Sequence, residues 1–184
     1  MVFLLACGGL LTHDLKVQPR DRAILLDVVD VVTQYPSLKV DPALGTYSKR
    51  RLTNGGIENT YRYKTPDGQQ PTLLVETHVL VAKDASAASL DYSAMKVSLS
   101  VGTAASRTVS AEDRPDALAW GDDHQCIAMV AAGNERGISC IARKGQSILL
   151  VLVAGALDTR PLSHDHGMDA LLAERLPAIE AYQR

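Results

Sequence analysis

Strand-length segments joined by tight-turn sequences constrain the fold of this chain more than any other feature. The segments 47–53 and 57–64 flank Asn54-Gly55-Gly56. Pro66-Asp67-Gly68 then precedes a long apolar run over 72–82. Gly, Asn and Asp tolerate the backbone angles that hairpin turns require. Because such turns join neighbouring antiparallel strands, these segments predict a β-meander.

The second half of the chain repeats this pattern. Strands are predicted there over 117–120, 124–130, 138–143 and 147–154. Gly133-Asn134 and Gly137 lie between the second and third of these segments and provide the backbone freedom of a hairpin loop.

Three segments have the 3.6-residue spacing of helices. Asp21 is placed to cap the first, over 21–32, and Asp84 opens the second, which ends near Gly102. The third is predicted over 165–182. The order of elements predicts an α+β fold with a mostly antiparallel sheet of about six to seven strands and three helices packed mainly on one face. At 184 residues and 46% hydrophobic content, residues 21–184 are expected to form a single domain.

The N-terminal stretch Leu4-Leu5-Ala6-Cys7 resembles the lipobox of bacterial lipoproteins. That resemblance implies that Cys7 carries lipid, that residues 1–20 are a signal remnant and a tether, and that the protein faces the periplasm of a bacterial envelope. Gly8 instead of an aspartate favours the outer membrane. Export signals have a basic start and roughly 7 to 15 apolar residues, and only six residues precede Cys7. Two alternatives follow: a start upstream of Met1, or an apolar strand with a buried cysteine.

The layout of the elements, and no residue motif, also resembles the PsbP-like fold. This scaffold occurs in several small exported proteins and lipoproteins. The resemblance concerns the order of helices and strands alone, so it implies no functional residue.

The other two cysteines, Cys126 and Cys140, lie on the two predicted strands of one hairpin. Pairing Val130 with Arg136 places the two cysteines opposite each other, within reach of a disulfide. An even number of cysteines besides the lipidated one fits an oxidising compartment. The alternative is two reduced, buried cysteines acting as small hydrophobic residues.

The strongest candidate for chemistry is Ser163-His164-Asp165-His166-Gly167-Met168-Asp169. His164, His166 and Asp169 are weak candidate metal ligands, since imidazole and carboxylate groups bind transition metals. On a helix, however, residues two positions apart point in different directions. Capping of the last helix by Ser163 or Asp165 is therefore the favoured interpretation, and no metal or other cofactor is predicted.

Two further polar features have a structural and a functional interpretation. His78 lies beside Glu76 on one face of a predicted apolar strand. It is either a buried titrating group or part of a half-exposed strand face. Lys49-Arg50-Arg51 is interpreted as a solvated strand edge. With a net charge of -2 and interspersed charges, the chain has no sign of a nucleic-acid surface.

These observations favour an exported lipoprotein that is a non-enzymatic binding or adaptor module. Its expected partners are the membrane, through lipid on Cys7, and a protein of the envelope. One alternative is an envelope hydrolase or metalloprotein that uses His164, His166 and Asp169. The other is a cytosolic regulatory domain with a fortuitous lipobox.

Overall fold

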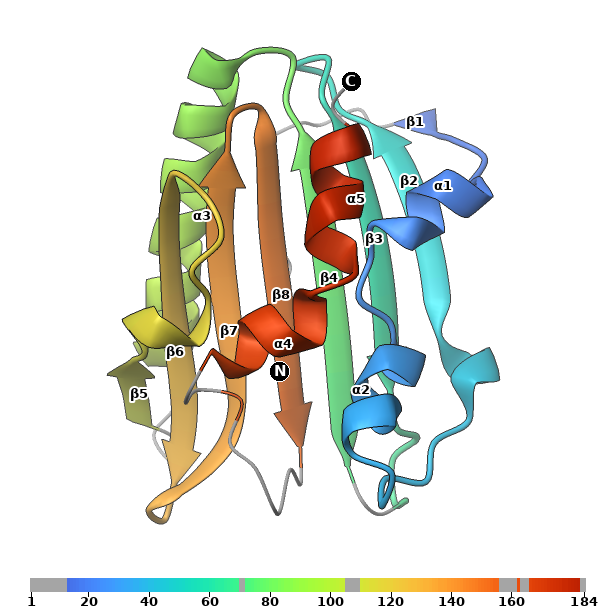
Figure 1. Cartoon of the computed structure of the whole chain (residues 1–184), viewed down its shortest axis with the longest axis vertical. Coiled ribbons are helices and arrows are strands. Elements are labelled where there is room, and N and C mark those ends of the chain that lie inside the picture. The colour runs from blue at the N-terminus through green and yellow to red at the C-terminus, as the bar shows by residue number, and fades with distance from the viewer. Residues whose placement is uncertain (1–12, 70–71, 105–109, 156–161, 163–165, 183–184) are drawn as a thin grey trace.

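The computed structural model describes residues 13–69, 72–104, 110–155, 162 and 166–182 (Figure 1). The described residues form one eight-stranded antiparallel sheet with helices on both of its faces. The strands are β1 His13–Asp14, β2 Thr46–Arg51, β3 Ile57–Lys64, β4 Leu73–Val81, β5 Ser110–Asp113, β6 Asp123–Ala131, β7 Asn134–Lys144 and β8 Ser147–Gly155. The helices are α1 Pro19–Ala23, α2 Val28–Gln34, α3 Ala85–Ala104, α4 Gly167–Leu172 and α5 Arg175–Tyr182, with 3-10 turns η1 Pro42–Leu44 and η2 Pro115–Ala117.

The sheet joins two meanders, β2-β3-β4 and β6-β7-β8, in the order β1-β2-β3-β4-β8-β7-β6-β5. The last strand of each meander lies at the centre, where Leu73 is paired with Gly155 and Val81 with Ser147. Both predicted hairpins of the first meander are present. At the first turn the side chain of Asn54 accepts a hydrogen bond from the amide of Gly56 at 3.0 Å, and Gly55 has a φ of +88°.

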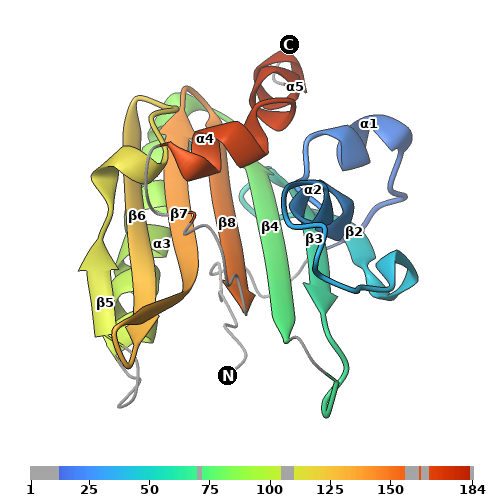
Figure 2. The same cartoon turned by 60° about the horizontal axis from the view of Figure 1, so that its bottom comes forward.

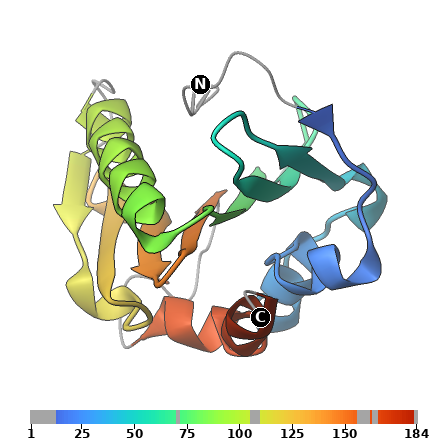
Figure 3. The same cartoon turned by 90° about the horizontal axis from the view of Figure 1, so that it is seen from above.

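Each face of the sheet has its own core because successive side chains of a strand point to opposite faces. On one face, α2, α4 and α5 pack over residues such as Val75, Val79 and Val151. On the other face, one side of α3 packs against residues such as Ile127, Ile141 and Ile148. The α3 residues in this contact are Ala88, Tyr92, Met95 and Leu99. Figure 3 shows α3 on one side of the sheet and α4 and α5 on the other.

The α+β class is confirmed, but the predicted details of the fold are wrong. The sheet has eight strands instead of six to seven, and more than three helices pack on two faces instead of mainly one. The strands β1 and β5 have two and four residues, too few for an alternating pattern to be recognised. The strand predicted over 117–120 is also absent: its first residue, Ala117, ends the 3-10 turn η2, and the residues after it form no strand.

Two predicted helices are each divided in two. The segment predicted as one helix over 21–32 forms α1 and α2, separated by the buried residues Ile24, Leu25 and Leu26. The carbonyl of Leu26 accepts a hydrogen bond from the hydroxyl of Thr77 at 2.8 Å, and Asp27 then caps α2. The backbone between the helices is thus bonded to the sheet. The helix predicted over 165–182 is likewise divided into α4 and α5.

No helix in the described ranges combines the length and the apolar character needed to span a bilayer.

Candidate functional site

The helix α3 covers only part of its face of the sheet. It packs against β5, β7 and β8. Figures 2 and 3 show no described helix over β2, β3 and β4 on that side. We call this part of the sheet the β2–β4 face. The strand register places Glu58, Thr60 and Arg62 of β3 on it, next to Glu76 and His78 of β4.

Four of these side chains form an acid–base cluster: His78, Glu58, Glu76 and Arg62. The Nδ1 atom of His78 lies 3.1 Å from Oε1 of Glu58, and its Nε2 atom lies 3.0 Å from Oε1 of Glu76. The second oxygen of Glu76 is 3.7 Å from Nη2 of Arg62. The side chains of His78 and Glu76 are only 13% and 9% exposed, whereas Arg62 is 43% exposed. The imidazole is therefore held between two carboxylates on neighbouring strands.

The two carboxylates determine the charge of this histidine. Burial alone lowers the pKa of His78, but the hydrogen bonds and charges of Glu58 and Glu76 outweigh it and raise the pKa to about 9. Burial raises the pKa of Glu76, yet the hydrogen bond from His78 and the charges of His78 and Arg62 bring it below its usual value. At neutral pH both ring nitrogens of His78 are therefore protonated and donate to carboxylates. Such an imidazolium holds two strands together and has no free nitrogen to act as a general base.

The charge on His78 predicts a loss of stability at alkaline pH. A histidine whose pKa is raised on folding stabilises the protein fully below its unfolded pKa, and this contribution is lost as the pH rises through about 9. We expect the free energy of unfolding, measured by urea denaturation, to fall by about 2 kcal/mol between neutral pH and about pH 10. His78→Gln should remove most of this slope.

His124→Gln is the matched control, because His124 is exposed and has no ion-pair partner in the described part of the chain. This variant should keep the pH dependence of the unmodified protein. An equal slope in the His78→Gln variant would mean that other groups cause the alkaline loss.

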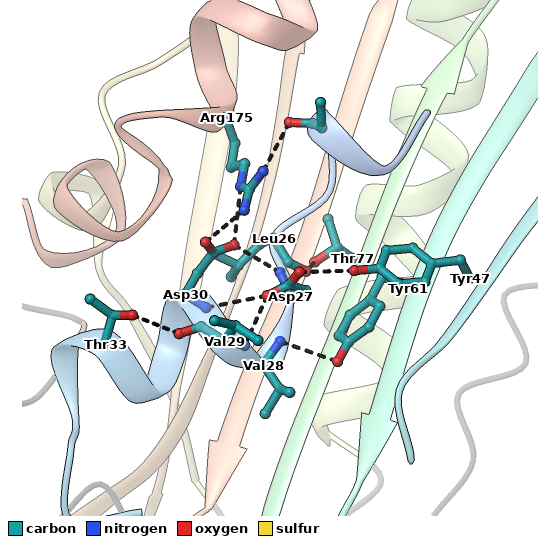
Figure 4. Close-up of polar contacts among 11 residues, drawn as sticks. Leu26, Asp27, Val28, Val29, Asp30, Thr33, Tyr47, Tyr61, Thr77 and Arg175 are labelled. Atoms are coloured by element: carbon teal, nitrogen blue, oxygen red, sulfur yellow. Dashed lines mark hydrogen bonds and ion pairs between the residues drawn. The ribbon is translucent and has the colours of Figure 1, made fainter. Parts of the chain in front are cut away.

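A second polar network lies on the opposite face, where α2 and α5 meet the sheet (Figure 4). The carboxylate of Asp27 accepts hydrogen bonds from the amide of Val29 at 2.8 Å and from the hydroxyl of Tyr47 at 2.8 Å. The carboxylate of Asp30 accepts two from Arg175, at 2.6 and 3.0 Å. Burial, together with Asp27, raises the pKa of Tyr47. These groups bind one another, so the network attaches helices to the sheet.

A buried ion pair links α1, β2 and α5 on the same face. The Nζ atom of Lys49 lies 2.8 Å from Oδ1 of Asp21, and the side chains are 8% and 1% exposed. The same oxygen accepts a hydrogen bond from the hydroxyl of Tyr182 at 2.6 Å. Burial opposes the charge on Asp21, but these two hydrogen bonds, a third from the amide of Gln18 and the charge of Lys49 together outweigh it and lower its pKa. The interpretation of Lys49-Arg50-Arg51 as a solvated edge is therefore wrong for Lys49.

The disulfide between Cys126 and Cys140 is present, with an S–S distance of 1.99 Å and both cysteines buried. The two residues are directly paired across β6 and β7, as predicted. Nearer the turn the predicted pairing is wrong: Val130 is paired with Glu135 because the register shifts after Met129. A bulge at this shift takes one residue out of the ladder without moving the cysteines.

The remaining predicted site residues are only partly covered by the structure. Cys7 and His164 lie outside the described residues, as do the proposed caps Ser163 and Asp165. The Nδ1 atom of His166 lies 3.1 Å from Asp169, whose two oxygens each accept a hydrogen bond from the amide of Ala119 at 3.0 Å. Within the described ranges, no group of three or more His, Cys, Asp or Glu side chains is arranged to hold a metal ion.

Two members of the acid–base cluster, Glu58 and Arg62, were not identified from the sequence. Residues 57–64 and 72–82 are predicted strands joined by a short turn, so a register for this hairpin would have placed Glu58 near His78. The sequence shows which residues of each strand share a face, but it does not show which residue of one strand is paired with which residue of the other.

Comparison with known proteins gives this chain no relative. No protein-family model matches it, and neither the curated proteins nor the solved structures contain a match. The resemblances to the lipobox and to the PsbP-like layout therefore stay predictions.

Proposed function

We propose that this protein is an exported bacterial lipoprotein, anchored through lipid on Cys7, and that it is a non-enzymatic binding or adaptor module for an envelope protein. The observation that carries the proposal is the buried disulfide between Cys126 and Cys140. Structural disulfides form and persist in oxidising compartments such as the periplasm. With this pair bonded, Cys7 is the remaining cysteine of the chain, and it stands in the lipobox-like sequence.

The acid–base cluster is not arranged for hydrolysis with His78 as the general base. A hydrolase that uses histidine as a general base needs a ring nitrogen free to accept a proton. Both nitrogens of His78 are occupied by carboxylates, and its pKa of about 9 keeps it charged. The cluster is thus suited to holding the sheet in one arrangement.

Lipidation of Cys7 is tested by metabolic labelling of the gene expressed with its own upstream region. We expect radiolabelled palmitate to be incorporated and the protein to sediment with membranes. Cys7→Ala should remove the label and release the protein, because the cysteine sulfur carries the lipid. The variant Cys126→Ala/Cys140→Ala is the matched control and should keep its label.

Thiol alkylation separates this proposal from a cytosolic domain. In the envelope, Cys126 and Cys140 should resist alkylation of the denatured protein until a reductant is added. The proposal would be contradicted if the Cys7→Ala variant kept the localisation of the unmodified protein and if Cys126 and Cys140 were both free thiols.

A further inference from the structure

Basic side chains gather at the edge of the sheet where the described chain begins. Pairing of β1 with β2 places His13 opposite Arg51 and Asp14 opposite Arg50. The ion pair between Lys49 and Asp21 joins α1 to β2. Figure 1 shows β1 and α1 beside β2. We call the exposed cations of this region the basic edge: Lys16, Arg20, Arg22, Arg50 and Arg51.

The basic edge has a local excess of positive charge. Residues 13–23 and 49–51 carry six basic and two acidic side chains, in a chain whose net charge is -2. Asp21 is buried against Lys49 and offsets none of the exposed cations, whereas Asp14 lies 3.3 Å from Arg50 and offsets that one alone. The described part of the chain provides no ion-pair partner for the other four exposed cations, which are Lys16, Arg20, Arg22 and Arg51.

The position of this edge in the chain indicates what it meets. Cys7 precedes His13 by six residues, which span at most about 20 Å when fully extended. A lipid on Cys7 would therefore hold the basic edge within about 20 Å of a bilayer. Stable anchoring of a lipidated protein generally takes a second signal, and a polybasic surface provides one. The attraction of lysine and arginine to anionic headgroups is weak at a separation of about 20 Å and becomes strong when the side chains contact the headgroups.

We propose that the basic edge binds the anionic headgroups of a phospholipid bilayer and turns this edge of the domain toward the membrane. The membrane is inferred as the partner from the proposed lipid anchor at Cys7. The binding surface is inferred from the charges of the described residues. Nucleic acid is the other polyanion that such a surface attracts. The experiment therefore includes it as an outcome.

The test is co-sedimentation of the full chain with vesicles, using the Cys7→Ser variant so that no lipid is attached. We expect binding to vesicles that contain phosphatidylglycerol, little binding to phosphatidylcholine alone, and weakening by added salt. Arg20→Gln/Arg51→Gln in this background should weaken binding about 25-fold, since each cation near an anionic surface contributes about 5-fold.

Lys39→Gln/Arg136→Gln is the matched control, because both residues are exposed, lie outside the basic edge and change the net charge equally. Equal weakening by the two double variants, or no preference for anionic vesicles, would overturn the proposal. Tighter binding to single-stranded RNA than to anionic vesicles would also overturn it. Vesicle binding without palmitate labelling would refute the anchor and leave the basic edge intact, so the two proposals fail separately.

Discussion

Lys49→Met is expected to lower the free energy of unfolding by about 3 to 5 kcal/mol. The substitution keeps most of the apolar length of the side chain but removes the ammonium group. Asp21 would then be buried without a counter-charge, with the hydroxyl of Tyr182 and the amide of Gln18 as its remaining hydrogen-bond donors in the described part of the chain. Leaving a buried carboxylate without its counter-charge costs far more than losing a surface ion pair. Urea denaturation monitored by circular dichroism measures the change.

Two further variants show whether the buried charge is the cause. Arg50→Met removes the neighbouring cation, which is 49% exposed and pairs with Asp14, and it should cost at most about 1 kcal/mol. Asp21→Asn in the Lys49→Met background removes the uncompensated charge and should recover part of the loss. If Lys49→Met costs no more than Arg50→Met, the ion pair contributes little to stability.

Removing the disulfide with Cys126→Ala/Cys140→Ala is expected to lower the free energy of unfolding by about 3 kcal/mol. The two cysteines are 14 residues apart, and in the chain-entropy model closing a loop of about 15 residues stabilises the folded state by about this amount. For a domain of this size the loss corresponds to a fall of roughly 6 to 12 °C in Tm. Thermal unfolding followed by circular dichroism measures it.

Reductant provides the internal control for this prediction. Reducing the unmodified protein should lower its Tm toward that of the double variant, whereas the double variant should not respond to reductant. A double variant that melts within about 2 °C of the oxidised protein would contradict a stabilising role for the bond.

Local patterns were sufficient to predict several parts of the fold. The turn Asn54-Gly55-Gly56 predicted the hairpin of β2 and β3, because its residues favour a reversal of the chain wherever they occur. The pairing of Cys126 with Cys140 followed from the short distance between two strands of one hairpin. Alternation within β4 identified His78 and Glu76 as residues of one face.

Features that depend on distant segments were not predicted. The long helix α3 packs on the face opposite α4 and α5, which no periodicity within α3 itself specifies. Leu26 interrupts a helical pattern because its carbonyl bonds to Thr77, 51 residues away. Lys49 appeared as part of a basic run because its partner Asp21 is 28 residues distant.

The sequence by itself determined the α+β class, the hairpins and the disulfide of this protein. These properties arise from residues close together in the chain, whose backbone preferences and spacing act over a few positions. Only the tertiary structure decided which strands meet at the centre, which faces the helices cover, and that Lys49 is buried while its neighbours form the basic edge. Those properties depend on which apolar surfaces, from segments far apart in the chain, pack together and are removed from water. No local pattern of residues specifies that packing.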